Sequence, residues 1–355
     1  MHLVELLAFR SVPVAGVSLG LTRRCPLSCA HCSTNSTLTS EQHPASMFER
    51  FVDTFDAGNR PEVLAMSGGE ALLRPELVRK LAERAREAGT RSTVLSGMFF
   101  ANSRSIPPPI RAAIQAVDHF SASIDVFHER EVPRANVFRV LDGLLSEGKD
   151  VSLHVVGQDA GDAYLEDIIS EVRKVFGGSV PMLVNAVSSF GRARAWFTRD
   201  QAGPPGEIEA DPCAMAAWPV VGFDGTIVAC GNDDALDSGP AHLRLGHANV
   251  DDWATIRTRS LNSSMMRAIR LFGPEYIADR FGDRGRGCDG YCQTCMKLSE
   301  QPALAQRIGQ VMAKPSAAIL EEQVSAMQRR AGAVAFARSH GLSRYAELVV
   351  LGAPA

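Results

Sequence analysis

Three of the eight cysteines stand close together near the amino end of the chain. Cys25, Cys29 and Cys32 follow one another at CxxxCxxC spacing, directly after an apolar run that predicts a buried strand. Three thiolates on one tight loop can hold three irons of a [4Fe–4S] cube and leave the fourth iron open for a ligand. Structural zinc with His31 as fourth ligand is the alternative. His31 and Cys32 are adjacent, and neighbouring residues ligate one ion awkwardly, which favours iron–sulfur over zinc.

The other five cysteines begin at Cys213, about 180 residues after Cys32. Cys213 and Cys230 frame a segment that contains Gly225, and a tighter group is formed by Cys288, Cys292 and Cys295. An even number of cysteines is compatible with disulfides, but spacings of two and three residues suit a shared metal or cluster better. A closed cluster takes four ligands, so that one of the five cysteines is left over.

Composition and charge restrict what these cysteines can serve. The chain has 355 residues, 45% of them hydrophobic and 22% charged, which is the balance of an ordinary globular protein. A net charge of −3 provides no basic field for a nucleic acid or an anionic membrane surface. No run approaches the roughly 20 apolar residues that a spanning helix needs, and the amino end lacks the basic start of a signal peptide. We therefore expect a cytoplasmic protein without a nucleic-acid or membrane partner.

Strand and helix patterns alternate along the first half of the chain, which predicts parallel βαβ units. Six such units predict an α/β fold, a partial (β/α)6 TIM barrel. Apolar runs predict strands at 14–21, 62–67, 92–96, 120–124, 151–156 and 182–187. Amphipathic segments predict helices at 45–57, 75–88, 107–116, 134–147 and 162–176.

The pattern changes after Gly191. The GPPG run at 203–206 predicts a linker, and 218–229 predicts a hairpin that turns at Asp224 and Gly225. Residues 301–355 are rich in Ala, Leu and Arg and are expected to be helical. We therefore predict a barrel over 1–200, a small C-terminal α+β domain over 201–300 and a helical extension over 301–355.

Together, three short motifs resemble the radical S-adenosylmethionine (SAM) superfamily. The run from Leu21 to Cys32 is similar to the cluster loop of that family, with His31 in place of its usual aromatic residue. The run from Ser67 to Glu70 resembles the GGE motif, which contacts the amino group of SAM. The run from Ser123 to Asp125 resembles the SxD motif near the SAM ribose. Each motif ends a predicted strand, where active sites of (β/α) barrels assemble.

The resemblance implies a [4Fe–4S] cluster on Cys25, Cys29 and Cys32, with SAM bound beside it. The residue types fit, because glycine lets the backbone approach a ligand closely and a carboxylate accepts hydrogen bonds from an ammonium group. Each of these residues also has an alternative role. The GGE motif can be a turn before a helix, Asp125 can cap a helix, and Arg192 can be an exposed turn residue. The candidate cofactor-binding residues are His31, Ser67, Gly68, Gly69, Glu70, Ser96, Ser123, Asp125 and Arg192.

A second resemblance covers the later cysteines. Eleven residues, Gly225 and four further residues separate Cys213 from Cys230, which resembles the opening of the SPASM and twitch domains. These domains bind auxiliary [4Fe–4S] clusters, and the twitch pattern implies one such cluster on Cys213, Cys230, Cys292 and Cys295. That leaves Cys288, which replaces one of these ligands, is a buried inert thiol, or returns a hydrogen atom to a substrate radical. The last role makes it the candidate catalytic residue.

By this resemblance the chain reductively cleaves SAM and abstracts hydrogen from a natural-product substrate. The segment before Val14 is too short for a leader-peptide-binding domain, which tilts the expectation toward epimerisation or dehydrogenation of a small molecule such as a sugar or aminocyclitol. Epimerisation or cross-linking of a peptide is the alternative, and a non-catalytic iron–sulfur or zinc protein is the alternative of another class. The resemblance also implies an electron donor such as flavodoxin or ferredoxin.

Overall fold

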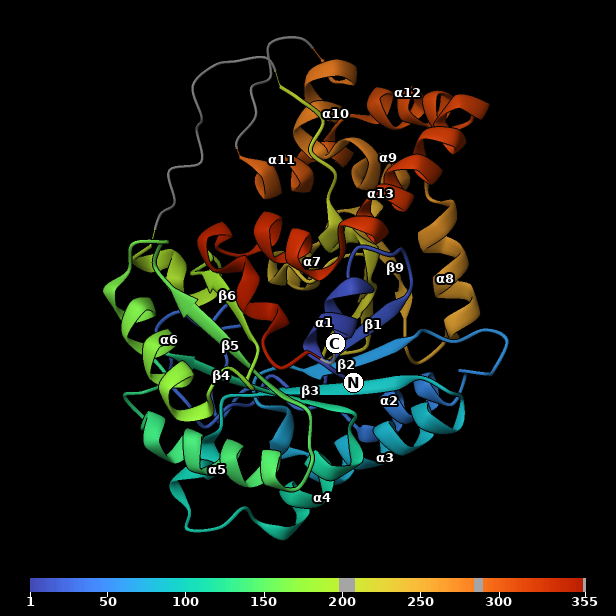
Figure 1. The fold of residues 1–355 in the computed structure, drawn as a ribbon. Coiled ribbons are helices and arrows are strands. Elements are labelled where there is room, and N and C mark those ends of the chain that lie inside the picture. The colour runs from blue at the N-terminus through green and yellow to red at the C-terminus, as the bar shows by residue number, and fades with distance from the viewer. Residues whose placement is uncertain (198–207, 284–289, 354–355) are drawn as a thin grey trace.

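The computed structural model describes residues 1–197, 208–283 and 290–353 (Figure 1). All six predicted strands are present, and each pairs in parallel with the next one along the chain. This arrangement confirms the α/β fold with a partial-barrel sheet. The strands are β1 Gly16–Gly20, β2 Val63–Ser67, β3 Arg91–Ser96, β4 His119–Asp125, β5 Val151–Gly157 and β6 Met182–Ala186.

The five predicted helices connect these strands and cover the outer side of the sheet (Figure 1). Each turns an apolar face to the strands; in α3 that face includes Leu77, Val78 and Leu81. Helix ends follow local chemistry: the Asp162 side chain accepts the Tyr164 N–H at the start of α6. The helices are α2 Ala45–Val52, α3 Pro75–Glu87, α4 Pro108–Ala116, α5 Arg134–Ser146 and α6 Ala163–Phe176.

The sheet continues past the barrel strands in the order β6-β5-β4-β3-β2-β1-β7-β8-β9. The predicted hairpin is formed by β7 (Val220–Val221) and β8 (Thr226–Val228), and β9 (Arg244–His247) follows antiparallel. Gly225 has a φ of +94°, which a glycine adopts without strain at this turn. Because β7 pairs in parallel with β1, the second group of cysteines is built directly on the barrel edge. The predicted linker lies outside the described residues.

The amino end holds an element that the sequence does not predict. Helix α1 (Leu3–Ala8) packs against the C-terminal helix α13 in a small core that includes Leu7, Ala214 and Phe336. The two ends of the chain lie side by side, and a ring nitrogen of His2 is 3.0 Å from the Leu351 carbonyl oxygen (Figure 1). Residues far apart in sequence therefore meet around the start of the chain.

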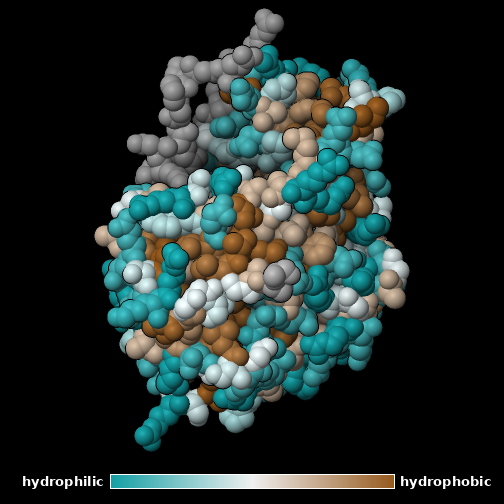
Figure 2. All heavy atoms as spheres, in the orientation of Figure 1, coloured by the Kyte–Doolittle hydropathy of each residue, from teal (hydrophilic) through white to brown (hydrophobic). Residues whose placement is uncertain are grey.

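The described C-terminal part is largely helical, as predicted for residues after 300. Its helices are α7 Asp233–Ser238, α8 Trp253–Asn262, α9 Ser264–Phe272, α10 Pro274–Phe281, α11 Tyr291–Lys297, α12 Pro302–Met312 and α13 Pro315–His340. Hydrophilic residues cover much of the face in Figure 2, where hydrophobic ones gather across the middle. Within the described residues, none of the helices has the length and apolar character needed to cross a bilayer.

Candidate functional site

The first cysteine loop leaves the carboxyl end of β1 and is held mainly by main-chain hydrogen bonds. The Cys25 N–H donates to the Thr37 carbonyl oxygen at 3.1 Å, and the Cys32 N–H donates to the Cys29 carbonyl oxygen at 3.2 Å. Cys25 and Cys29 are buried. Burial, together with the neighbouring charges of Glu70 and the other two cysteines, raises the pKa of Cys25 to about 12. The loop thus gathers three thiols, and burial disfavours the free thiolate of Cys25.

Residues after β6 fasten this loop from the other side. The Arg192 guanidinium donates to the Cys29 carbonyl oxygen at 2.9 Å and to the Ser36 carbonyl oxygen at 2.6 Å. Its backbone N–H donates to the Cys32 carbonyl oxygen at 2.9 Å. Gly191 has a φ of +53°, and a Cβ there would lie 2.2 Å from the Ser33 carbonyl oxygen. The structure therefore places Arg192 as a clasp on the loop, and a SAM contact for it stays a prediction.

The two glycines after β2 bring a second loop against the first. The Gly69 N–H donates to the Thr22 carbonyl oxygen at 2.7 Å, and the Glu70 N–H donates to the Arg24 carbonyl oxygen at 2.9 Å. A Cβ on Gly68 or Gly69 would lie 2.5 Å from one of these carbonyl oxygens. The close approach that glycine permits is therefore, in this structure, an approach to the cysteine loop itself.

Glu70 connects the ends of β2 and β3. Its side chain is 1% exposed and accepts hydrogen bonds from the N–H groups of Leu72 and Gly97, both at 2.9 Å, and from the Ser96 hydroxyl at 3.0 Å. Burial raises the pKa of Glu70 to about 7, against the opposing effect of these hydrogen bonds. The predicted pair of Glu70 and Ser96 is thus brought together, with the carboxylate beside the cysteine loop.

Asp125 ends β4 and is fully buried among polar partners. Its carboxylate accepts the Phe127 and His128 N–H groups at 2.9 Å, and lies 2.5 Å from the His128 ring and 3.3 Å from the His31 ring. Burial alone raises the pKa of Asp125, but the hydrogen bonds from His128 and His31 lower it below its usual range. Ser123 lies two residues earlier on the same face of β4.

His128 belongs to this group, although the motif alone does not identify it. Burial lowers its pKa, but contacts with Asp125 and the Cys29 thiol outweigh burial and raise it to about 10. His31 stacks on Phe127, with ring centroids 4.7 Å apart. The ligand atoms of His31, Asp125 and His128 lie within 4.8 Å of one another. The position of His128, three residues after Asp125, is compatible with a residue of the site. The same position is equally compatible with an ordinary loop residue, so the sequence does not decide between the two.

The second group of cysteines gathers from three separate segments. Cys213 precedes the 3-10 turn at 214–217, Cys230 follows β8, and Cys292 and Cys295 lie one turn apart on α11. Burial and the other cysteines raise the pKa of Cys230 to about 12. The same causes raise the pKa of Cys295 further, and its neighbours are the other three thiols. The structure thus brings the four predicted ligands together, whereas Cys288 lies outside the described residues.

Helix α7 joins the two cysteine sites. It begins three residues after Cys230 and presents acidic side chains to the first loop. Asp237 pairs with Arg23, Asp234 pairs with Arg194 at 2.6 Å, and buried Asp233 hydrogen-bonds Ser33. Each basic or hydroxyl partner stands within a few residues of the first cysteine loop or its clasp. The two sites are therefore tied to each other through side chains.

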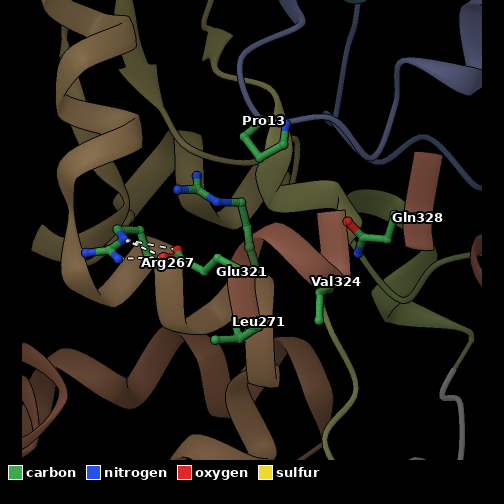
Figure 3. A pocket seen from close by; sticks show the side chains of 7 residues that line it. Pro13, Arg267, Leu271, Glu321, Val324 and Gln328 are labelled. Carbon is green, nitrogen blue, oxygen red and sulfur yellow. Dashed lines mark hydrogen bonds and ion pairs between the residues drawn. The ribbon is translucent and has the colours of Figure 1, made fainter. Parts of the chain in front are cut away.

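A small pocket lies between the amino-terminal segment and helices α9 and α13 (Figure 3). Its lining includes Pro13, Leu271 and Gln328, and the Arg267 guanidinium pairs there with Glu321 at 3.0 Å. None of the lining residues is a cysteine or belongs to the motifs at the strand ends. This pocket is therefore separate from both cysteine sites.

One comparison with known proteins covers the residues of the first site. Residues 19–172 match the sequence profile of the Radical SAM superfamily. No curated protein sequence matches the chain.

Solved structures match the fold. Streptococcus suis SuiB bound to S-adenosylmethionine aligns with a TM-score of 0.47 and 13% identity, over 62% of this chain and 60% of that one. SuiB bound to precursor peptide SuiA gives 0.52 and 12%, over 77% and 71%. A structure of anSMEcpe with bound AdoMet and Cp18Cys peptide gives 0.47 and 11%, over 84% and 99%. The chain thus spans less than two thirds of the length of the first of these relatives, and the SuiA-bound structure shares its fold.

Proposed function

We propose that the chain, whose residues 19–172 match the Radical SAM superfamily, abstracts a hydrogen atom from a natural-product substrate, leading to epimerisation or dehydrogenation. One observation carries the proposal: three thiols and two buried carboxylates lie together at the carboxyl ends of neighbouring parallel strands. The carboxylates are Glu70 and Asp125, both at most 1% exposed. A domain of this family holds a [4Fe–4S] cluster and SAM.

The residues of the first loop favour a cluster over a single zinc ion. His31 and Cys32 are adjacent, and neighbouring residues ligate one zinc ion awkwardly. A cluster takes each of the three thiolates on an iron of its own and leaves the fourth iron open. The residues therefore fit the group that the family binds.

The protein's own residues position the cluster and SAM and exclude water from them. When bound, the reduced cluster and SAM supply a 5′-deoxyadenosyl radical, which takes a hydrogen atom from the substrate. We propose that Cys25, Cys29 and Cys32 hold the cluster, that Glu70 accepts the SAM ammonium group, and that Asp125 holds the ribose hydroxyls. Arg192 keeps the loop in place through its bonds to the Cys29 and Ser36 carbonyl oxygens.

The wider group of predicted SAM contacts supports this arrangement. Ser96 donates to Glu70 and orients its carboxylate. Ser67 and Gly69 hold the second loop against the first through main-chain hydrogen bonds with Leu21 and Thr22. A Cβ on Gly68 would lie 2.5 Å from the Thr22 carbonyl oxygen. We propose that His31, which stacks on Phe127 beside Asp125, also contacts the bound cofactor.

For the second site we propose one auxiliary [4Fe–4S] cluster on Cys213, Cys230, Cys292 and Cys295. The mutual proximity of these four thiols, which raises the pKa values of Cys230 and Cys295, supports it. Such a cluster can accept an electron from a substrate radical, which would make the net reaction an oxidation. Zinc is the alternative occupant.

Cys288 is the remaining cysteine, and we propose that it returns a hydrogen atom to the substrate radical. Turnover in deuterated water tests this role, because a thiol exchanges its hydrogen with solvent. A product that carries solvent deuterium, and is lost in Cys288→Ala, supports hydrogen donation. An unlabelled product, or loss of iron from the variant, would instead make Cys288 a bystander or a ligand.

The substrate class has two candidates. A small molecule such as a sugar or aminocyclitol is the first. A peptide is the second, and it is favoured by the shared fold with the structure of SuiB bound to precursor peptide SuiA. We further propose a cytoplasmic location, since a reducing compartment keeps cluster ligands as thiols, and a flavodoxin or ferredoxin as electron donor.

Formation of 5′-deoxyadenosine tests the enzyme proposal against a non-catalytic iron–sulfur or zinc protein. Anaerobically reconstituted protein is incubated with dithionite and SAM, with and without candidate sugars and peptides, and Cys32→Ala serves as control. Formation of 5′-deoxyadenosine by the wild type alone supports the proposal. If neither protein forms it under any of these conditions, the chain is not an enzyme of this kind.

A further inference from the structure

Arg10 joins the amino-terminal segment to the second cysteine site. Its backbone N–H donates to the Leu7 carbonyl oxygen at 3.0 Å, just beyond α1. Its guanidinium carbon lies 4.9 Å from the ring centroid of Trp218, and the Trp218 indole N–H donates to the Phe9 carbonyl oxygen at 3.0 Å. Trp218 lies between Cys213 and Cys230 in the sequence. The arginine is therefore fixed against the segment that supplies two of the four thiols.

The Arg10 guanidinium has an unpaired buried donor. Its Nη1 atom is shielded from solvent and has no hydrogen-bond partner among the described residues. Leaving a charged donor buried and unpaired costs several kcal/mol, and proteins normally pair such groups. The charges of Cys213 and Cys230, once these thiols are deprotonated, act on the Arg10 guanidinium and oppose the effect of burial on its pKa. Burial lowers the pKa of Arg10 to about 10, so it is still a cation at neutral pH.

A second buried arginine near this site is already satisfied. Arg270 donates to the Ser260 carbonyl oxygen at 2.9 Å, to the Ser260 hydroxyl at 3.4 Å and to the Ala216 carbonyl oxygen at 3.5 Å. The charge of Arg270 also interacts with Cys213. Among the described residues, however, Arg270 has no buried nitrogen without a hydrogen-bond partner, whereas Arg10 has one. Arg10 is therefore the side chain whose pairing depends on what the cysteines bind.

We propose that Arg10 is a positioning residue of the second site, which donates a hydrogen bond to the thiolate of Cys213 or Cys230 and raises the reduction potential of a cluster held there. The inference rests on the auxiliary cluster of the proposed function. Four thiolates around a [4Fe–4S] core carry net negative charge, which increases when the cluster is reduced by one electron. A fixed cation and a hydrogen bond to sulfur both favour the reduced state.

The test isolates the second cluster in the full-length chain. Cys25, Cys29 and Cys32 are all changed to alanine, and the reconstituted protein is titrated with dithionite while the electron paramagnetic resonance signal is recorded. Arg10→Gln and Arg10→Lys are compared with Arg91→Gln, which is a matched control. Arg91 packs on Phe9 of the same segment, with its guanidinium carbon 5.4 Å from the ring centroid, but pairs with Glu5 rather than with a cysteine.

We expect Arg10→Gln to keep about four irons and to shift the midpoint potential to more negative values. Arg10→Lys is expected to fall between it and the parent, and Arg91→Gln to match the parent. An unchanged potential in Arg10→Gln would overturn the inference and leave the auxiliary cluster standing. If Arg10→Gln holds no iron, Arg10→Lys decides: iron retained with lysine supports a role of charge, whereas iron lost in both shows that Arg10 serves packing alone. A parent without iron would overturn the auxiliary cluster and, with it, the inference.

Discussion

The two cysteine sites differ in the segments that supply their thiols and in the charged side chains beside them. The first lies on contiguous loops at strand ends, fastened by main-chain hydrogen bonds and bordered by the buried carboxylates Glu70 and Asp125. The second draws its thiols from three separate segments and is bordered by the half-buried arginines Arg10 and Arg270. Negative charge beside the first site suits a ligand with an ammonium group, and positive charge beside the second suits an anionic cluster closed by protein. The difference agrees with the proposal of one open, reactive site and one closed site.

The largest expected effect is on SAM cleavage, which should depend on the first cysteine site and not on the second. Cys29→Ala removes a proposed ligand of the first cluster and should abolish formation of 5′-deoxyadenosine from SAM. Cys230→Ala removes a proposed ligand of the second cluster and should leave SAM cleavage measurable, because Cys230 is not part of the first loop. Chromatographic assay of 5′-deoxyadenosine checks both variants. Complete loss in both would mean that the two sites do not function separately.

The clasp after β6 should matter to folding as well as to the first site. Gly191→Ala places a Cβ 2.2 Å from the Ser33 carbonyl oxygen at a φ of +53°. We expect the free energy of unfolding to fall by about 3 kcal/mol or more, together with iron lost from the first site. Urea denaturation and iron analysis measure these effects.

Gly177→Ala is the matched control. Its φ is +59°, with nothing within 4 Å of the added Cβ, so only the left-handed backbone costs free energy, about 1 kcal/mol. Equal losses in the two variants would show that backbone conformation alone matters, and that Gly191 does not serve the cysteine loop.

His119, the first residue of β4, should affect the stability of the fold without affecting either cysteine site. Buried His119 lies 2.8 Å from the Ser152 hydroxyl, and burial lowers its pKa from 6.5 to about 4. A lowered histidine pKa means that the unfolded chain binds more protons between pH 6.5 and 4, so stability falls as the pH falls through that window. The loss at pH 4 amounts to at most about 3 kcal/mol.

Urea denaturation of the iron-free protein between pH 7.5 and 4 checks this dependence. The difference in unfolding free energy between wild type and His119→Gln should narrow on acidification. A constant difference would show that His119 titrates as in the unfolded chain. The iron content of both sites at neutral pH should be unchanged, which keeps this effect separate from the cysteines.

The smallest expected effect concerns the link through α7. Asp234→Asn breaks the pair with Arg194, whose side chain is 57% exposed, and should cost less than about 1 kcal/mol. Thermal unfolding and iron analysis provide the measurement. Loss of iron from both sites would contradict two independently built centres and would make α7 a shared structural support.

The barrel was predictable because its information is local. Buried parallel strands appear as short apolar runs, and all six were placed from such runs with ends that differ by a residue or two. The motifs of the first site follow these strands directly, so their meeting at one edge follows from the fold. Helix α1 was not predicted because six residues carry too little periodicity.

The surroundings of the two sites depend on contacts that are distant in sequence. Arg10 reaches thiols some 200 residues away, and Asp237 reaches Arg23 across a similar separation. His128 stands next to its motif, but its contact with the Cys29 thiol follows only from the folded loop. The gathering of these thiols could thus be predicted from spacing, whereas the charges that border them could not.

We propose that one chain holds two iron sites on separate sets of cysteines. Iron per chain after anaerobic reconstitution tests this most directly, in the wild type, in a variant with Cys25, Cys29 and Cys32 changed to alanine, and in one with Cys213 and Cys230 changed. We expect about eight irons in the wild type and about four in each variant. About four irons in the wild type, all lost with the first three cysteines, would contradict it.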